Sequence, residues 1–333
     1  MTRTGVDGLR MRTIAFGAVL AATLLAAATA AASPYIHAHR GGSLTSVKGK
    51  QRPLFPESSM AAFREAARRG FVLELDVKLS ADDRPVVIHD GTLDRTTDCE
   101  GPVASLTLAQ LRNDCEIDVL GTNENERPLG PKDERRATIP TLRQVLKLAR
   151  ERGVDVNIEI KNLPTDPDFD PGSGYARTVV EEVKQSAIPP SRVIFQSFLP
   201  ANLEVVEADP YFERAETSFL TLKSLEAVGP GLADGAGYDW VSPEWPLGPG
   251  YVEEAHSLGL RVVPYTVDTP ADVRAATEAG VDALITNDPR MARRVVPIGR
   301  AEAAADAEAA GPQGVQRRGG RQPRDPDREL PPR

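Results

Sequence analysis

Hydrophobic and polar positions repeat with two different periods along residues 35–296 of the chain. Short apolar runs with a period of two predict strands at residues 35–39, 72–79, 155–161, 192–197, 215–220, 239–241, 261–267 and 282–286. Runs with helical periodicity predict helices at residues 60–69, 142–152, 176–187, 201–208, 222–228, 252–258, 271–279 and 289–295. Most predicted strands are therefore followed by a predicted helix.

This alternation favours a parallel sheet covered by helices, an α/β fold. The repeated strand–helix units fall within residues 33–300, and a closed (β/α)8 TIM barrel typically has about 250 residues. No Gly-rich dinucleotide-binding sequence follows a predicted strand, which counts against an open Rossmann-type sheet. Residues 91–140 interrupt the alternation. We expect them to form a small insertion after the strand that ends at His89, packed over one end of the barrel.

The two ends of the chain differ from this body. Three arginines precede an uncharged, Ala- and Leu-rich stretch at residues 13–32 that ends in Ala-x-Ala sites. This pattern predicts a signal peptide over residues 1–32 and a secreted or cell-envelope protein without a stable membrane anchor. A transmembrane anchor is the alternative, because the stretch is long enough to span a bilayer. Residues 301–333 lack aromatic residues and are predicted to be a disordered tail.

Charge and cysteine content narrow the classes of partner. The formal net charge is -8, whereas nucleic-acid binding needs clustered Lys and Arg, so we expect no nucleic-acid partner. A small phosphorylated substrate is compatible with this charge, because a local cation can reverse the field in one cleft. Cys99 and Cys115 are not a predicted zinc site, because no other metal ligands flank them at the spacing of such sites. We expect them to pair as a disulfide, and two free thiols are the alternative.

Acidic side chains recur on one face of two predicted strands. Glu74 and Asp76 alternate with apolar residues, and so do Glu159 and Lys161. Carboxylates inside a closed barrel are costly to bury unpaired, and a divalent cation with oxygen ligands, Ca²⁺ or Mg²⁺, removes that cost. The alternative is a solvated acidic face on an exposed strand. In a barrel we favour the metal site.

Histidines supply the second part of the candidate chemistry. His39, followed by Arg40, and His89 are each expected at the carboxyl end of a strand, where active-site groups of such barrels gather. Two imidazoles can act as proton donor and acceptor. His37 is expected in the core or behind the site, and His256 on the surface. Acid–base groups beside cations and a metal suit the hydrolysis of a phosphate diester.

Several motifs, in this order along the chain, resemble the glycerophosphodiester phosphodiesterase family. They include His39-Arg40-Gly41, Pro56-Glu57-Ser58-Ser59, Glu74-Leu75-Asp76-Val77, Val87-Ile88-His89-Asp90 and Glu159-Ile160-Lys161, with residues 93–97, 139–142, 196–198, 265–268 and 280–287. The resemblance implies a (β/α)8 barrel, a divalent metal, and hydrolysis of a small-molecule glycerophosphodiester to glycerol 3-phosphate and an alcohol.

The resemblance also implies a role for individual residues. Glu74, Asp76 and Glu159 match metal ligands, His39 and His89 match an acid–base pair, and Arg40, Glu57, Lys161 and Tyr265 match substrate- or metal-site support. The chain departs from the family pattern at Ser58-Ser59, where Asn-Thr is usual, and in the surroundings of Tyr265 and Asp268, since the family often has Trp near the first and Asn near the second. The segment 41–56 is also longer than expected.

Two other functions use the same residues. A sphingomyelinase D-like phospholipase shares the barrel, the histidine pair and the acids, but is expected to differ after the first histidine. A secreted barrel that binds phosphorylated head groups without turnover is the non-catalytic alternative, and the loss of one histidine or acid would have indicated it. We expect the hydrolytic enzyme.

Overall fold

The computed structural model describes residues 33–47, 50–117 and 137–296. The chain divides into two units, residues 1–31 and 32–333, and the first contains none of the described residues. The predicted signal peptide and tail, and residues 118–136 of the predicted insertion, therefore lie outside the described part of the chain. In that part no helix is long and apolar enough to cross a membrane.

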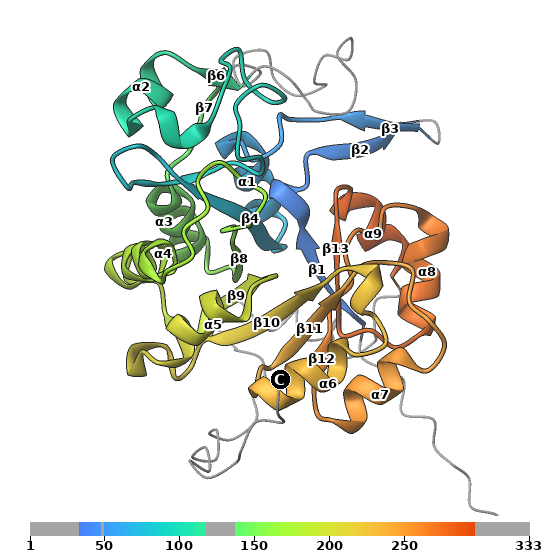
Figure 1. Ribbon diagram of the computed structural model, residues 1–333. Coiled ribbons are helices and arrows are strands. Elements are labelled where there is room, and N and C mark those ends of the chain that lie inside the picture. The colour runs from blue at the N-terminus through green and yellow to red at the C-terminus, as the bar shows by residue number, and fades with distance from the viewer. Residues whose placement is uncertain (1–32, 48–49, 118–136, 297–333) are drawn as a thin grey trace, which may run out of the picture. The chain divides into compact units, whose positions relative to one another are not determined.

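Parallel strands form the barrel that the sequence predicts (Figure 1). In spatial order they are β12 (Arg261–Val262), β11 (Trp240–Pro243), β10 (Glu216–Thr221), β9 (Val193–Ser197), β8 (Val156–Ile160), β4 (Val72–Leu79), β1 (Tyr35–Ala38) and β13 (Ala283–Thr286). Backbone hydrogen bonds join the two ends of this series: Asp282 N–H donates to Val262 O and Ile285 N–H donates to Pro264 O, each at 3.0 Å. The predicted TIM barrel is confirmed.

Helices follow the strands and begin at residues suited to capping. They are α1 (Met60–Arg68), α3 (Leu142–Arg152), α4 (Gly174–Gln185), α5 (Pro200–Glu207), α6 (Gly229–Ala236), α7 (Tyr251–Ser257), α8 (Pro270–Glu278) and α9 (Pro289–Val295). Ser59 accepts a hydrogen bond from the Ala62 N–H at the start of α1, and Thr141 forms a capping box with Gln144 at the start of α3. Such caps satisfy N–H groups that have no partner within the helix.

One predicted helix is wrong. Residues 222–228 contain only the 3-10 turn η6 (Lys223–Leu225), and the helix lies further on, at α6. Pro230 falls in the first turn of α6, where a missing N–H costs nothing, so the proline does not break the helix. Glycine has low helix propensity, so the glycines of α6 gave this segment no helical pattern in the sequence. The other 3-10 segments are η1 (His39–Gly41), η2 (Val103–Ser105), η4 (Pro190–Arg192) and η5 (Pro210–Phe212).

The main core lies between the strands and the helices. On β4, Leu73, Leu75 and Val77 are fully buried in it, while the alternate residues of the strand face the barrel interior. Phe195 on β9 packs edge-to-face on Phe212 at 5.2 Å between ring centroids. Burying a side chain of this size stabilises the fold by roughly 1.5–3 kcal/mol. The helices thereby hold the strands, and the polar inner faces, in one register.

The segment that leads to His89 differs from the prediction. Strand β5 (Pro85–Val87) pairs antiparallel with β4, with Val77 opposite Val87, so it is not a barrel strand. The expectation that His89 ends a strand equivalent to β1 is wrong. A short apolar run has the same pattern in either direction, and the turn at residues 80–84 sends the chain back along β4.

The rest of the insertion has its own small core. It contains α2 (Leu108–Asn113) and the pair β6 (Glu116–Ile117) and β7 (Ala137–Thr138). Val103, Leu111 and Ile139 are fully buried together with side chains that follow β5. Cys99 and Cys115 form the predicted disulfide there. A hairpin, β2 (Leu44–Val47) with β3 (Lys50–Pro53), fills part of the long segment after β1 and was not predicted.

Candidate active site

The first site residues lie on a tight turn after β1. Arg40, Gly41 and Gly42 all have positive φ angles, of 50°, 86° and 66°. A side chain at Gly41 would place its Cβ 2.8 Å from the Ala62 Cβ, so this left-handed turn needs glycine. The turn directs the Arg40 N–H to Oε2 of Glu74 at 2.9 Å. It thereby brings the end of β1 over the acidic residues of β4.

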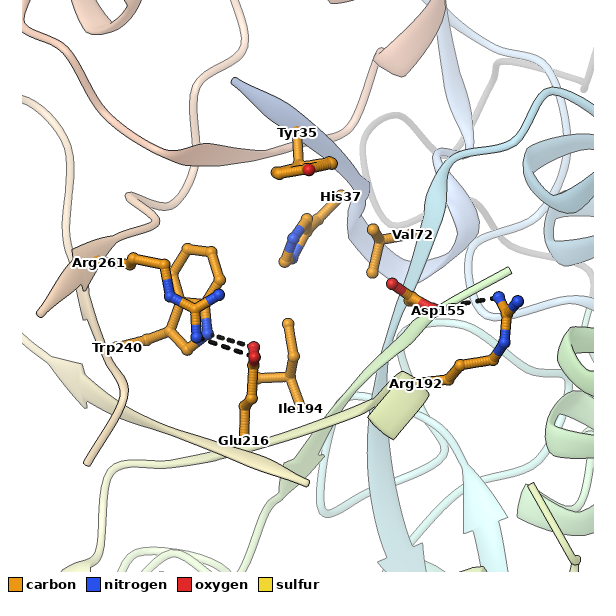
Figure 2. Close-up of a pocket in the computed structure, with 9 residues that line it drawn as sticks. All are labelled: Tyr35, His37, Val72, Asp155, Arg192, Ile194, Glu216, Trp240 and Arg261. Carbon is orange, nitrogen blue, oxygen red and sulfur yellow. Dashed lines mark hydrogen bonds and ion pairs between the residues drawn. The ribbon is translucent and has the colours of Figure 1, made fainter. Parts of the chain in front are cut away.

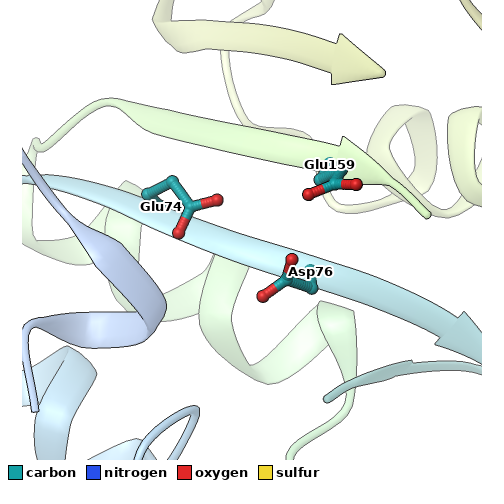
Figure 3. A group of neighbouring side chains, drawn as sticks. All are labelled: Glu74, Asp76 and Glu159. Carbon is teal, nitrogen blue, oxygen red and sulfur yellow. The ribbon is translucent and has the colours of Figure 1, made fainter. Parts of the chain in front are cut away.

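Three buried carboxylates gather on the neighbouring strands β4 and β8, two along the middle of β4 and one near the carboxyl end of β8 (Figure 3). Glu74, Asp76 and Glu159 each offer an oxygen, and these oxygens lie within 4.8 Å of one another. Asp76 and Glu159 are direct neighbours across the two strands, as the parallel register requires. Gln196 on β9 donates its Nε2–H to Glu74 Oε1 at 2.8 Å. The structure thus brings together the three residues that the sequence predicted as metal ligands.

Crowded negative charge shifts the pKa values of this cluster. Burial and the charge of Asp76 raise the pKa of Glu74 well above its usual range. Burial raises the pKa of Glu159 to about 7, against the opposing effect of Lys161. Burial alone would also raise the pKa of Asp76, but Lys161, His89 and Arg40 outweigh it and hold that pKa well below its usual range. The cluster therefore carries less than its full charge unless a cation compensates it.

The donor set fits a divalent cation. All three groups are carboxylates, the ligands that Ca²⁺ and Mg²⁺ prefer. Oδ2 of Asp76 is buried and has no hydrogen-bond partner, although buried polar atoms usually have one. Lys161 Nζ compensates part of the charge, at 3.2 Å from Asp76 Oδ1 and 3.0 Å from Glu159 Oε2. Arg40 Nε forms an ion pair with Asp76 Oδ2 at 3.6 Å but no hydrogen bond, so a cation at the remaining oxygens would supply the close partner that this atom lacks and lower the like-charge repulsion.

Both predicted histidines line the same pocket and are held at Nδ1. His39 Nδ1 lies 2.8 Å from Oδ1 of Asn287, and His89 Nδ1 lies 2.5 Å from Oδ1 of Asp90. Burial and the adjacent Arg40 guanidinium hold the pKa of His39 well below its usual range. Because Nδ1 of each ring is occupied, Nε2 is the nitrogen left for a ligand.

The pocket encloses about 390 Å³ of space, part of which is open solvent. It is lined by His39, Arg40, Glu74, Asp76, His89, Glu159, Gln196, Phe198, Leu220, Tyr265, Thr266 and Ile285. The Tyr265 hydroxyl donates to Thr221 O at 3.1 Å, and its ring packs edge-to-face on Phe198. Tyr265 therefore contributes an aromatic wall rather than a free hydroxyl.

Glu57 lies behind the pocket rather than in its wall. Its Oε1 accepts from Arg40 Nη1 at 3.2 Å and from Arg95 Nη2 at 2.7 Å, and Arg95 Nε also pairs with Asp90 at 2.5 Å. The carboxyl is buried, but these guanidinium groups hold the pKa of Glu57 below its usual range. Glu57 thus fixes Arg40, and Arg95 fixes the carboxylate that holds His89.

Four contributing residues were not among the predicted site residues. Gln196 and Asn287 follow the predicted pattern of polar groups near the carboxyl ends of barrel strands, which could have singled them out. Asp90 is adjacent to His89 in the sequence. Neither its place in the sequence nor the strand pattern could have singled out Arg95, because its contact with Glu57 depends on how the insertion folds.

A second pocket lies at the opposite end of the barrel (Figure 2). Its lining residues stand where the strands begin. There, Trp240 Nε1 donates to Glu216 Oε2 at 2.8 Å, and the Arg261 guanidinium stacks 4.0 Å from the Trp240 ring centroid. Burial lowers the pKa of the His37 ring to about 3, which fits the core position expected for it. Catalytic groups of TIM barrels lie at the other end, so the carboxylate pocket is the candidate active site.

Comparisons with known proteins agree with this fold and site. Residues 39–291 match the Glycerophosphoryl diester phosphodiesterase family. A glycerophosphodiester phosphodiesterase of Caldanaerobacter subterraneus is 30% identical over 281 residues, covering 79% of this chain and 97% of the relative. A solved structure from Silicibacter pomeroyi DSS-3, assigned as a glycerophosphoryl diester phosphodiesterase, is 26% identical with a TM-score of 0.66, covering 79% of this chain and 93% of that one.

A third comparison concerns the fold alone. A phosphodiesterase of Oleispira antarctica, solved in complex with its product sn-glycerol-3-phosphate, is 22% identical with a TM-score of 0.62, covering 79% of this chain and 96% of that one. Barrel, acidic site and relatives together define the class as a phosphodiesterase built on a TIM barrel. The chain belongs to the Glycerophosphoryl diester phosphodiesterase family, a family of metal-dependent enzymes.

Proposed function

We propose that the chain is an exported enzyme that hydrolyses small glycerophosphodiesters to glycerol 3-phosphate and an alcohol. The observation that carries this proposal is one pocket that contains three buried carboxylates and two imidazoles, each imidazole held at Nδ1. The product named for the Oleispira antarctica relative supports glycerol 3-phosphate as the product here.

The two histidines would move the protons of the reaction. An oxygen nucleophile, water or a glycerol hydroxyl, forms the new bond to phosphorus, and one imidazole accepts its proton at Nε2. The bond from phosphorus to the alcohol oxygen breaks, and the other imidazole gives that oxygen a proton. If a glycerol hydroxyl is the nucleophile, this step leaves a cyclic phosphate; water then attacks its phosphorus and opens the ring to glycerol 3-phosphate, with the two imidazoles exchanging roles. Such paired acid–base catalysis typically contributes about 10²–10⁴-fold to a rate.

Fixed positive charge would stabilise the phosphoryl oxygens. Arg40 lines the pocket and is anchored by Glu57, so its guanidinium can meet an anionic oxygen without reorganising. A divalent cation held by Glu74, Asp76 and Glu159 would supply further Lewis-acid stabilisation. Lys161 holds two of these carboxylates in place.

The N-terminal pattern of residues 1–32 supports the proposed export. The disulfide in the insertion supports it, because disulfides persist in oxidising compartments. Expression of the full-length chain, followed by N-terminal sequencing of protein from the medium and the cell envelope, tests this part. Protein found only in the cytosol with an intact N-terminus would contradict it.

The activity is tested on purified protein with glycerophosphocholine, glycerophosphoethanolamine and sphingomyelin, each with Mg²⁺, with Ca²⁺ and with chelator. We expect metal-dependent release of glycerol 3-phosphate. Cleavage of sphingomyelin alone would support the sphingomyelinase D-like alternative, and tight binding without turnover would support the head-group-binding alternative.

Two variants and a matched control assign the histidines. His39→Ala and His89→Ala should each abolish turnover while thermal unfolding stays close to that of the wild type. His256→Ala, which changes an exposed histidine of α7 paired with Asp282, should keep full activity. Turnover retained in either of the first two variants would refute the role of that ring.

A further inference from the structure

Asp268 and Asn287 form a hydrogen-bonded chain that ends on His39. Asn287, which follows β13, has its Nδ2 2.7 Å from Oδ2 of Asp268 and its Oδ1 2.8 Å from His39 Nδ1. Oδ1 of Asp268 accepts from the Asn287 backbone N–H at 2.8 Å and from the Thr286 hydroxyl at 3.1 Å. Both oxygens of this carboxylate are thus committed to donors on the segment that carries Asn287.

The chemistry of these groups fixes the direction of every hydrogen bond. Burial raises the pKa of the Asp268 carboxyl, while the hydrogen bonds from Asn287 and Thr286 favour its ionised form. An ionised carboxylate accepts and never donates, so the Asn287 side chain must turn its NH₂ group toward Asp268. The amide oxygen of Asn287 then faces His39 and accepts from it. It follows that Nδ1 of His39 carries the proton of the neutral ring and that Nε2 carries a lone pair.

We propose that Asp268 is a positioning residue that, through Asn287, locks His39 in the tautomer whose Nε2 accepts a proton in the pocket. The proposal rests on the proposed function for its catalytic meaning, since it makes His39 the ring that takes the proton of the nucleophile. The tautomer itself is a property of the free protein. His89 differs, because a carboxylate rather than an amide oxygen faces its Nδ1.

The ring state of His39 can be measured directly. In protein labelled with ¹⁵N-histidine, long-range proton–nitrogen correlation spectra at neutral pH distinguish a protonated ring nitrogen from one with a lone pair. The His39→Ala variant assigns the signals by their loss. We expect Nδ1–H in the wild type, with and without Mg²⁺. A wild-type ring in the Nε2–H form would overturn the proposal, whether or not any variant folds.

The variant Asp268→Asn tests the cause. Its amide keeps one acceptor for the Asn287 N–H and the Thr286 hydroxyl, and turns a donor toward the Asn287 side chain. That side chain can then rotate and present its NH₂ to His39. We expect the Nε2–H tautomer to appear, with kcat lower by about tenfold and KM nearly unchanged, because a protonated Nε2 cannot accept the proton.

A matched control separates this effect from a general loss of stability. Asp282→Asn makes the same change beside another histidine, since Asp282 Oδ2 lies 2.8 Å from His256 Nε2 at the opposite end of the barrel. It should change the His256 signals and leave both the His39 tautomer and kcat as in the wild type. A fall in kcat in Asp268→Asn with an unchanged His39 tautomer would show a merely structural role and overturn the proposal.

The failure of the proposed function is distinguishable from the failure of this inference. If the wild type hydrolyses no glycerophosphodiester, the proposed function fails, and the tautomer measurement still decides whether Asp268 controls His39. If the wild type is active and its His39 carries Nε2–H, the proposed function stands and the inference fails.

Discussion

His89 Nδ1 lies 2.5 Å from Oδ1 of Asp90, the residue that follows it in the chain. Arg95 holds the same carboxylate through Nε at 2.5 Å and reaches Glu57 through Nη2 at 2.7 Å. Although burial opposes it, hydrogen bonds from His89 and Arg95 hold the pKa of Asp90 far below its usual range, so this group stays ionised. The ring of His89 is therefore oriented by a permanent negative charge.

The first prediction concerns this carboxylate. Asp90→Asn should lower kcat by roughly 10²-fold and change KM little, because a neutral amide no longer holds the His89 ring in its orientation. Steady-state kinetics on glycerophosphocholine measure both constants. Asp98→Asn, at an exposed residue of the same insertion that accepts from the Glu116 N–H, is the control and should stay active. An unchanged kcat in Asp90→Asn would show that Asp90 has no such role.

The second prediction concerns the pH dependence of metal binding. Burial raises the pKa of Glu159 to about 7, so below pH 7 this ligand holds a proton that an incoming cation must displace. Mg²⁺ affinity should therefore rise with pH through pH 7, by up to about tenfold per unit for each proton displaced, and Glu74 adds to this rise because its pKa is also raised. Isothermal titration calorimetry in buffers of different ionisation enthalpy measures the released proton. Affinity that is constant between pH 6 and pH 8 would contradict the prediction.

The third prediction concerns the stability that the metal-free protein loses when the buried Glu159 carboxyl ionises. A folded-state pKa above the ordinary 4.5 means that ionisation favours unfolding, and this cost grows as pH rises from about 4.5 to about 7. At pH 8, Glu159→Gln should therefore raise the stability of the metal-free protein, on the order of 2 kcal/mol or roughly 5 °C in Tm.

Thermal unfolding with chelator at pH 8 and at pH 5 checks the sign. The gain should be largest at pH 8 and mostly absent at pH 5, where the folded wild type holds Glu159 protonated and therefore uncharged, like the amide of the variant. Added Mg²⁺ should stabilise the wild type and have little effect on Glu159→Gln, because the variant lacks a ligand. A variant less stable than the wild type at pH 8 would show that the Lys161 ion pair outweighs the burial cost of Glu159.

The acidic cluster could be predicted from the sequence for a simple physical reason. Strand side chains alternate, and parallel register places Asp76 opposite Glu159 once the strands are assigned. The network around Asp90 could not be predicted, because Glu57 and Arg95 are 38 residues apart and meet only when the insertion folds. The sequence pattern could not predict that β5 runs antiparallel to β4, because an apolar run has the same periodicity in a parallel and in an antiparallel strand.

The inner face of β4 continues past the acids to Lys78, whose side chain is fully buried. Its ammonium group donates to Lys161 O at 2.8 Å, to Asp168 Oδ1 at 3.1 Å and to Asp166. This one cation ties the segment after β8 to the barrel. Removing one partner of a buried ion pair leaves an uncompensated charge in a region of low dielectric constant.

The last prediction follows from that charge. Lys78→Ala should destabilise the fold by about 3–5 kcal/mol, because the carboxylate of Asp168 stays buried without its cation. Lys147→Ala breaks an exposed pair with Glu151 on α3 and should cost less than about 0.5 kcal/mol. Lys78→Met combined with Asp168→Asn should recover most of the loss. Urea unfolding measures all three, and equal stabilities of Lys78→Ala and Lys147→Ala would show that the buried cation contributes nothing.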